Sequence, residues 1–122
     1  MIYPHLFSLL FSLLLPQLAT ALRKGPYQTN ILLAGYDENA GTDLYWMDYL
    51  GNMSKVKFGA HGYAGAFISS VFDREYKENM TQDEGIEVIK KCIHELKSRF
   101  LINQPNFTVK IVSKDGTKSM QL

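Results

Sequence analysis

The first half of the chain consists of short hydrophobic runs that are separated by glycine and polar residues. Residues 29–36 contain three consecutive aliphatic side chains, so both faces of this segment are apolar and the pattern predicts a buried strand. Residues 42–48 are rich in aromatic side chains, which favours a second strand. Residues 54–60 alternate lysine with apolar residues, as a half-exposed strand does. Because the connections are short, the sequence predicts an antiparallel meander.

The hydrophobic period then lengthens to three or four residues, which indicates helices. Residues 62–76 begin with small residues and continue with apolar side chains at helical spacing. Residues 81–100 open on Thr-Gln-Asp-Glu, a capping box in which Thr81 and Glu84 each accept a bond from the other's backbone N–H. The apolar stripe of this helix contains Ile86, Ile89, Ile93, Leu96 and Phe100.

Charged residues on this second helix have the spacing of ion pairs on a solvent-facing side. Glu87 and Lys91 lie four residues apart, and so do Glu95 and Arg99. Residues at this spacing are neighbours on consecutive helical turns, so we expect both pairs to form.

The two ends of the chain complete the pattern. Residues 107–112 alternate like a strand, Asp115-Gly116 forms a turn because both residues tolerate positive φ, and residues 117–122 return as its partner. Residues 17–23 have the pattern of the last turns of a helix, which Gly25-Pro26 would stop. Because strands and helices occur in blocks, the sequence predicts an α+β fold with antiparallel sheets.

The N-terminal segment differs from the rest because residues 1–22 contain no Asp, Glu, Lys or Arg. Its apolar centre, residues 6–15, is too short to span a bilayer as a helix but has the length of a signal-peptide core. Ala19-Thr20-Ala21 has the form of a signal-peptidase site. No basic residue precedes the apolar run, however, and a buried segment of a fold has the same pattern. The residues alone leave both interpretations open.

Composition narrows the class of protein. The chain has 122 residues, of which 46% are hydrophobic and 20% charged, which suits one folded domain. The net charge is only +1, so the chain lacks the excess of basic residues that is typical of nucleic-acid-binding proteins. A single cysteine, Cys92, excludes an intramolecular disulfide and a cysteine-built zinc site. No cofactor or metal is predicted.

Residues 37–48 have a faint likeness to a calcium-binding loop, with Asp37 at the first position and Asp48 at the twelfth. The sharp turn of such a loop needs glycine at the sixth position, where this chain has Thr42, and the twelfth ligand should be a bidentate glutamate. The flanking segments are also predicted strands and not helices. We therefore expect a solvated hairpin turn here.

Histidine and nucleophilic side chains form no catalytic or zinc pattern. His5, His61 and His94 share no ligand spacing, so a structural role is expected for each. Within the predicted helices, the candidate nucleophiles without a base at motif spacing are Ser69, Ser70 and Cys92. Cys92 adjoins the apolar stripe and is expected to be a small core residue.

Several stretches together resemble the C-terminal part of proteasome β-type subunits. They are "LATALRKGPYQTN", "NILLAGYDENAGTDLYWMDYLG", "FGAHGYAGAFISSVFDREY" and "EVIKKCIHELKSRFLINQPNFTVKIVSKDG". The hairpin "LLAGYDE", the turn "AHGYAGAF" and the helix exit "SRFLINQPNF" are specific in combination. The resemblance covers residues 18–118. We expect residues 18–122 to form a partial β-subunit domain behind an unmatched apolar leader, residues 1–17.

The resemblance implies the fold of the N-terminal nucleophile hydrolases, a four-layer αββα sandwich of antiparallel sheets, of which this chain resembles the C-terminal half. It implies a structural β subunit of the 20S core, where a seven-membered β ring helps to enclose the chamber for protein degradation. The implied partners are other β subunits and α-ring subunits, with no nucleic acid or membrane. The implied location is the cytoplasm and nucleus.

The resemblance also implies that the chain is not an enzyme. Catalytic members use an N-terminal threonine with an Asp and a Lys from a part that this sequence lacks. They also use a serine before the third family helix, and an Asp and a Ser just after the fourth. The matching positions here are His61, Phe100 and Asn103. A phenyl ring cannot relay a proton as a carboxylate does, so we expect no catalysis.

Within this family the sequence "LATALRKGPYQTN" matches the end of a helix, so Ala19–Ala21 would lie inside the fold and residues 1–17 would be an alternative start. A β subunit truncated in this way would leave one face of its sheet uncovered, and we expect the isolated chain to be poorly folded or non-functional. Two alternatives are a small secreted protein that uses residues 1–21 as its signal peptide, and an active threonine peptidase.

Overall fold

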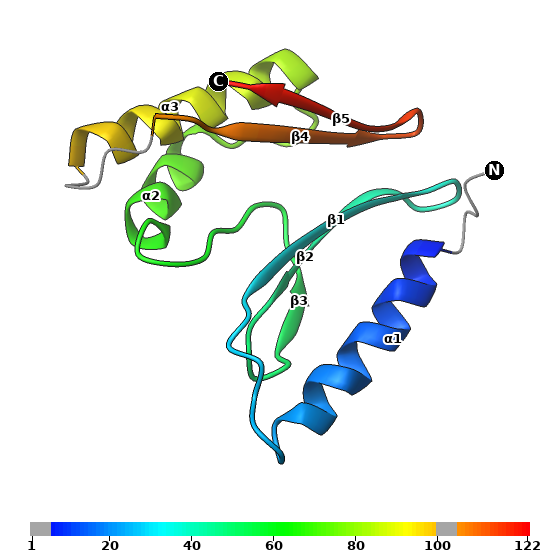
Figure 1. Cartoon of the computed structure of the whole chain (residues 1–122). Helices are drawn as coiled ribbons and strands as arrows, with labels where there is room; N and C mark the ends of the chain where they lie inside the picture. Colours follow the sequence, from blue (N-terminus) through cyan, green and yellow to red (C-terminus); the bar gives the residue numbers. More distant parts are fainter. Residues whose placement is uncertain (1–5, 100–104) are drawn as a thin grey trace. The chain divides into compact units, whose positions relative to one another are not determined.

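A computed structural model describes residues 6–99 and 105–122 of the chain. A helix is followed by three strands, two helices and two further strands, which is the block order of an α+β protein (Figure 1). The chain divides into two compact units, Met1–Lys57 with Ile111–Lys118, and Phe58–Lys110 with Ser119–Leu122. The predicted α+β class with antiparallel strands is confirmed.

Helix α1 (Leu6–Ala21) continues without a break past residue 17. Pro16 has no N–H and removes one helical bond, while the Thr20 hydroxyl donates to the Pro16 carbonyl oxygen at 2.7 Å. The helix ends where the sequence predicts, since Gly25 has φ of +138°, a backbone conformation that favours glycine. Across the described part of the chain, no helix is both long enough and apolar enough to cross a bilayer.

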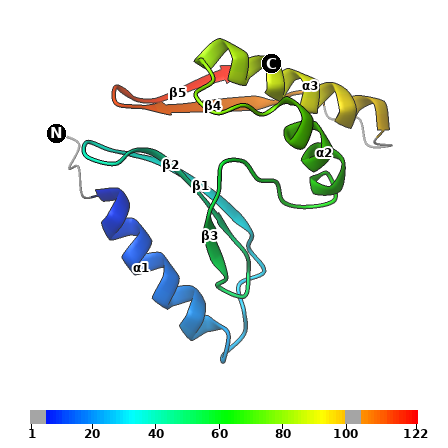
Figure 2. The same ribbon diagram turned by 180° about the vertical axis from the view of Figure 1, so that it is seen from behind.

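The sheet of the first unit consists, in spatial order, of β1 (Ile31–Asp37), β2 (Gly41–Met47) and β3 (Met53–Lys55). Both pairings are antiparallel, so the predicted meander is confirmed (Figure 2). Leu33 pairs with Tyr45, and Tyr45 pairs in turn with Lys55 across β2 and β3. Met47, which ends β2, is fully buried.

Two expectations for this sheet are wrong. The third strand ends at Lys55 and does not extend to residue 60. The Val56 N–H still donates to the Leu44 carbonyl oxygen at 2.9 Å, but Phe58 stacks on Phe72 with ring centroids 5.2 Å apart. The apolar residue at the end of the alternating pattern, Phe58, therefore packs on the helix that contains Phe72 and is not part of a strand. Leu32 is 42% exposed, so β1 is not buried on both faces.

In the second unit, α2 (Gly65–Glu75) and α3 (Gln82–Arg99) pack together through a small core. Its buried members are Val71 from α2, with Val88 and Cys92 one turn apart on α3. The expectation that Cys92 is a core residue is confirmed, because it is 4% exposed. Phe100, the last member of the predicted stripe, lies outside the described residues.

The predicted capping box at the start of α3 is confirmed. The Thr81 N–H donates to Glu84 Oε2 at 2.7 Å, and the Glu84 N–H donates to Thr81 Oγ1 at 3.3 Å. Both bonds satisfy backbone donors that a helix N-terminus otherwise leaves unpaired.

One of the two ion pairs expected on α3 is present in the structure. Glu95 bonds Arg99 at 2.7 Å, as the spacing predicts. Glu87 instead bonds Lys90 at 2.7 Å, and Lys91 bonds a carboxylate on α2. The Glu87–Lys91 pair is therefore wrong, because Lys91 has a partner on the neighbouring helix.

The final strands, β4 (Thr108–Ser113) and β5 (Gly116–Gln121), form the predicted two-stranded hairpin. Gly116 in its turn has φ of +104°, which accounts for the Asp-Gly pair. At the open end, the Leu122 N–H donates to the Phe107 carbonyl oxygen at 2.9 Å. The Lys97 ammonium lies 5.6 Å from the centroid of the Phe107 ring, a cation–π contact that links this end of the hairpin to α3.

Candidate functional site

The turn that leads into α2 holds His61, the first of the three residues that the sequence resemblance matches to catalytic positions. Its side chain is half-buried, and Gly62 follows with φ of +80°. The Gly65 N–H donates to the Gly62 carbonyl oxygen at 3.0 Å, which closes the turn before the first helical residue. Tyr63 at the tip is 91% exposed. Residues 61–64 of this turn thus include a histidine and a tyrosine and contain no serine.

The other two residues at those positions, Phe100 and Asn103, lie outside the described residues. Helix α3 is described as far as Arg99. The structure therefore places one of the three residues, His61.

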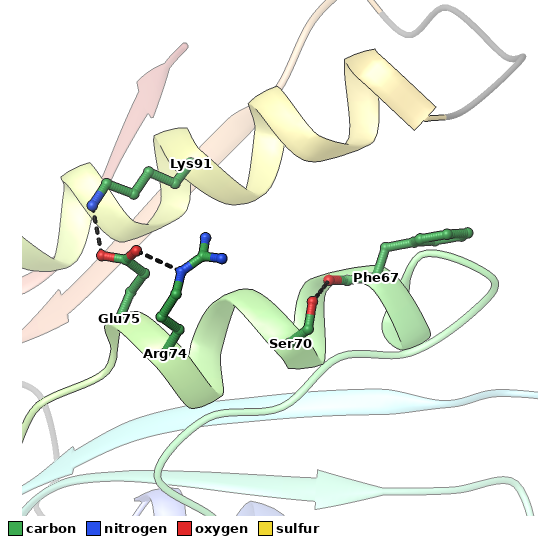
Figure 3. Close-up of polar contacts among 5 residues, drawn as sticks. All are labelled: Phe67, Ser70, Arg74, Glu75 and Lys91. Carbon is green, nitrogen blue, oxygen red and sulfur yellow. Dashed lines mark hydrogen bonds and ion pairs between the residues drawn. The ribbon is translucent and has the colours of Figure 1, made fainter.

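The serine candidates on α2 have their hydroxyl groups engaged by the helix itself. Ser69 Oγ donates to the Gly65 carbonyl oxygen at 2.6 Å, and Ser70 Oγ donates to the Phe67 carbonyl oxygen at 2.8 Å (Figure 3). Such bonds are ordinary for serine within a helix. A nucleophilic serine needs a neighbouring base that accepts its proton, and these hydroxyl groups donate to backbone carbonyls instead.

Cys92 and His94 do not form a catalytic pair in the described structure. Burial raises the pKa of the Cys92 thiol above its usual value, which keeps the thiol protonated and unreactive. His94 is exposed, and its carbonyl oxygen accepts a bond from Ser98 Oγ at 2.8 Å. His5 lies outside the described residues.

The loop that resembles a calcium site is a hairpin turn. Asp37 Oδ1 accepts bonds from the backbone N–H groups of Asn39 and Ala40 at 2.9 and 3.0 Å. Asp48 follows the far end of β2 and caps a different turn, where its Oδ1 accepts from the Asn52 N–H at 2.9 Å. A seven-residue strand separates the two carboxylates by roughly 20 Å. Among the residues that the structure covers, no cluster of metal-binding side chains occurs.

A charged cluster joins α2 to α3, and the sequence analysis did not find it. The Glu75 carboxylate accepts from Lys91 Nζ at 2.6 Å and from Arg74 Nε at 3.0 Å (Figure 3). These two bonds, with that of Lys91 the stronger, hold the pKa of Glu75 below its usual value. Glu75 and Lys91 are 16 residues apart, so no helical spacing could have signalled the contact. The cluster is a structural link between helices.

A groove of about 580 Å³ runs along the N-terminal half of α3. Two methionines, Met80 and Met120, face it from the α2–α3 connection and from β5. The other lining residues are Glu75, Lys77, Asp83, Glu84, Ile86, Glu87, Val88, Lys90 and Lys91. Because its charged lining residues have both signs, the groove shows no preference for an anionic or a cationic ligand.

Comparison with known proteins identifies a family whose sequence profile matches most of this chain. The profile of the family described as "Proteasome subunit" matches residues 5–112. The chain is 52% identical to proteasome subunit beta type-2-B of Arabidopsis thaliana over 102 residues, which cover 84% of this chain and 51% of the relative. It is 43% identical to the type-2 subunit of rice, over 84% of this chain and 48% of the relative.

A more distant relative, proteasome subunit beta type-4 of Saccharomyces cerevisiae, is 40% identical over 85% of this chain and 54% of its own length. The chain thus spans about half the length of the relatives that it matches. The sequence motifs indicate a β-type subunit, and the type-2 subunit in particular, and this similarity is confirmed.

Proposed function

This chain belongs to the proteasome subunit family, and on that premise we propose that it is a non-catalytic, structural β subunit of the 20S core. The observation that carries the proposal is the 52% identity to a β type-2 subunit over 84% of the chain. In this role the chain helps to enclose the chamber in which proteins are degraded. Its partners are other β subunits and α-ring subunits, and its location is the cytoplasm and nucleus.

The side chains at the family's supporting catalytic positions favour a structural role over catalysis. By the sequence resemblance, His61 occupies the position of a serine, and Phe100 and Asn103 occupy those of an aspartate and a serine. A phenyl ring neither accepts a proton nor orients a charged nucleophile. Of the candidate nucleophiles on the described helices, Ser69 and Ser70 donate to backbone carbonyls and Cys92 is buried.

We further propose that the sheet β1–β2–β3 is one layer of the four-layer αββα sandwich. An uncovered apolar side chain on a sheet supports this, because such faces are normally packed against a second layer. Leu32 on β1 is 42% exposed, and it pairs with Trp46 on β2. This face has the composition of a sandwich interior.

Native separation of core particles tests the proposal. Cells that express a tagged copy would be lysed, the 20S particles isolated, and the peptide spanning residues 1–23 sought by mass spectrometry, since the first tryptic site is Arg23. We expect this peptide to migrate with the particle. Its confinement to aggregates or degraded material would overturn the structural role.

An activity probe that acylates the nucleophile of threonine peptidases tests the non-catalytic part. We expect labelling of other β subunits in the same particles and none of this chain. Covalent labelling of this chain, located by peptide mapping, would overturn the assignment as a non-catalytic subunit while leaving incorporation intact.

A further inference from the structure

Met80 occupies the connection between α2 and α3, directly before the capping residue Thr81. Its side chain packs against the small core of the second unit, whose buried members are Val71, Val88 and Cys92. Its sulfur also accepts a bond from the Lys77 N–H at 3.3 Å, which closes the connecting loop. One thioether thus contributes both to the core of the helix pair and to the loop that joins it.

The same side chain is accessible to small oxidants. Met80 lines the groove of about 580 Å³ and is only half-buried, whereas Met47 is 0% exposed. The other sulfur in this core belongs to Cys92, which is 4% exposed. Because burial raises the pKa of its thiol, little of the reactive thiolate forms at neutral pH. A thioether needs no deprotonation to react, so oxidation in this core falls on Met80.

We propose that Met80 is a peroxide-sensitive site whose oxidation loosens the packing of α2 on α3. In the reaction the Met80 sulfur attacks one oxygen of hydrogen peroxide, the O–O bond breaks and an S–O bond forms. The sulfur loses two electrons and the peroxide gains them. The proton on the transferred oxygen passes to the departing hydroxide, which leaves as water. The product is methionine sulfoxide, which reductases convert back to methionine.

The expected consequence follows from the change in polarity. A sulfoxide oxygen is a strong hydrogen-bond acceptor, and its burial against the apolar core without a donor costs free energy. If the oxygen turns toward the Lys77 N–H, it occupies the space between that N–H and the sulfur, so the sulfur is displaced from its present position against the core. Both arrangements weaken the contact between the helices, and the first turn of α3 should open more often.

The test is hydrogen exchange on the full chain before and after a fixed dose of hydrogen peroxide. Peptide mass spectrometry would measure sulfoxide at each methionine and confirm that Cys92 remains a thiol. We expect amides in residues 82–90 to exchange about tenfold faster after oxidation, while amides of β1 and β2 are unchanged. Methionine sulfoxide reductase with a thiol reductant should restore the original rates.

Met80→Leu keeps the apolar volume but cannot be oxidised at this position, and Met53→Leu is the matched control on β3. Peroxide should accelerate exchange in the control as in the parent chain and leave Met80→Leu unaffected. Equal acceleration in Met80→Leu would overturn the proposal. So would absence of sulfoxide at Met80 when Met120, in the same groove, is oxidised. If Met80→Leu fails to fold, the repair experiment decides, since exchange that stays fast after repair of Met80 contradicts the proposal.

Discussion

Single residues at the start of α3 satisfy backbone groups that would otherwise have no partner within the helix. Thr81 and Glu84 exchange side-chain bonds with each other's backbone N–H. The Thr81 N–H, followed by its hydroxyl, holds the pKa of Glu84 below its usual value, because both donate to the ionised carboxylate. The box is exposed to water, so its effect is local to the helix end.

Replacement of the capping residue tests this role. Thr81→Ala removes the oxygen that accepts from the Glu84 N–H, and we expect the free energy of unfolding of the second unit to fall by about 1 kcal/mol. Thr117→Ala, at an exposed position on β5, is the matched control and should change little. Urea titration followed by circular dichroism measures both. Equal losses in the two variants would show that the cap contributes nothing specific.

At the scale of elements, an ion pair connects helices α2 and α3: the Glu75 carboxylate of α2 bonds Lys91 of α3 and also Arg74 of its own helix (Figure 3). It complements the apolar contact of Val71 with Val88 and Cys92. The Glu75 side chain is 24% exposed, so solvent screens the pair and the apolar core contributes more of the stability. The ionic link nonetheless makes the packing dependent on pH.

Lowering the pH should weaken this link in a predictable window. Because the pKa of Glu75 is lowered in the folded chain, its stabilising effect is complete above the ordinary value of 4.5 and disappears as pH falls through the lower folded value. Hydrogen exchange of α2 amides, measured at descending pH and corrected for intrinsic rates, should show reduced protection in that range. Unchanged protection would mean that the carboxylate does not couple the helices.

A pair of lysine variants separates the link between helices from an ordinary pair within one helix. Lys91→Gln removes the main partner of Glu75, and NMR titration should show the Glu75 pKa moving up toward its ordinary value. Lys90→Gln removes only the bond to Glu87 on the same helix and should leave that pKa unchanged. Similar shifts in both variants would contradict the assignment of Lys91 as the main cause.

At the scale of the whole molecule, the proposed role depends on faces that the described chain leaves uncovered. Leu32 and Tyr63 are exposed on different units, at 42% and 91%. A contiguous exposed apolar patch marks a contact surface, and Leu32 pairs with Trp46 on the same face of the sheet. Under the proposed function, another layer or subunit covers this face.

A substitution on the exposed face of β1 tests the proposed sandwich in the assembled particle. Leu32→Thr keeps a residue that favours strands but removes apolar surface, so we expect about tenfold less tagged chain in purified 20S particles. Glu38→Gln in the exposed hairpin turn is the control and should assemble normally. Normal incorporation of Leu32→Thr would show that no second layer covers this face.

The sequence by itself determined what depends on neighbouring residues. The capping box and the glycine turns act over a few positions, and each is present where the pattern predicts it. The alternation of residues 54–60 gives a strand only as far as Lys55. Family membership was also readable, because several specific motifs occur in the expected order. Of the candidate site, the sequence predicted His61 at the turn before α2 and Cys92 in the core, and the structure places both there.

The tertiary structure decided what depends on partners distant in sequence. Lys91 bonds Glu75 and not Glu87, because packing places a carboxylate of α2 within reach. Strand β3 ends at Lys55, and Phe58 stacks on Phe72 of α2 instead of continuing the ladder. The packing of Met80 against the core of Val71, Val88 and Cys92 has the same origin, since this core forms only once α2 packs on α3.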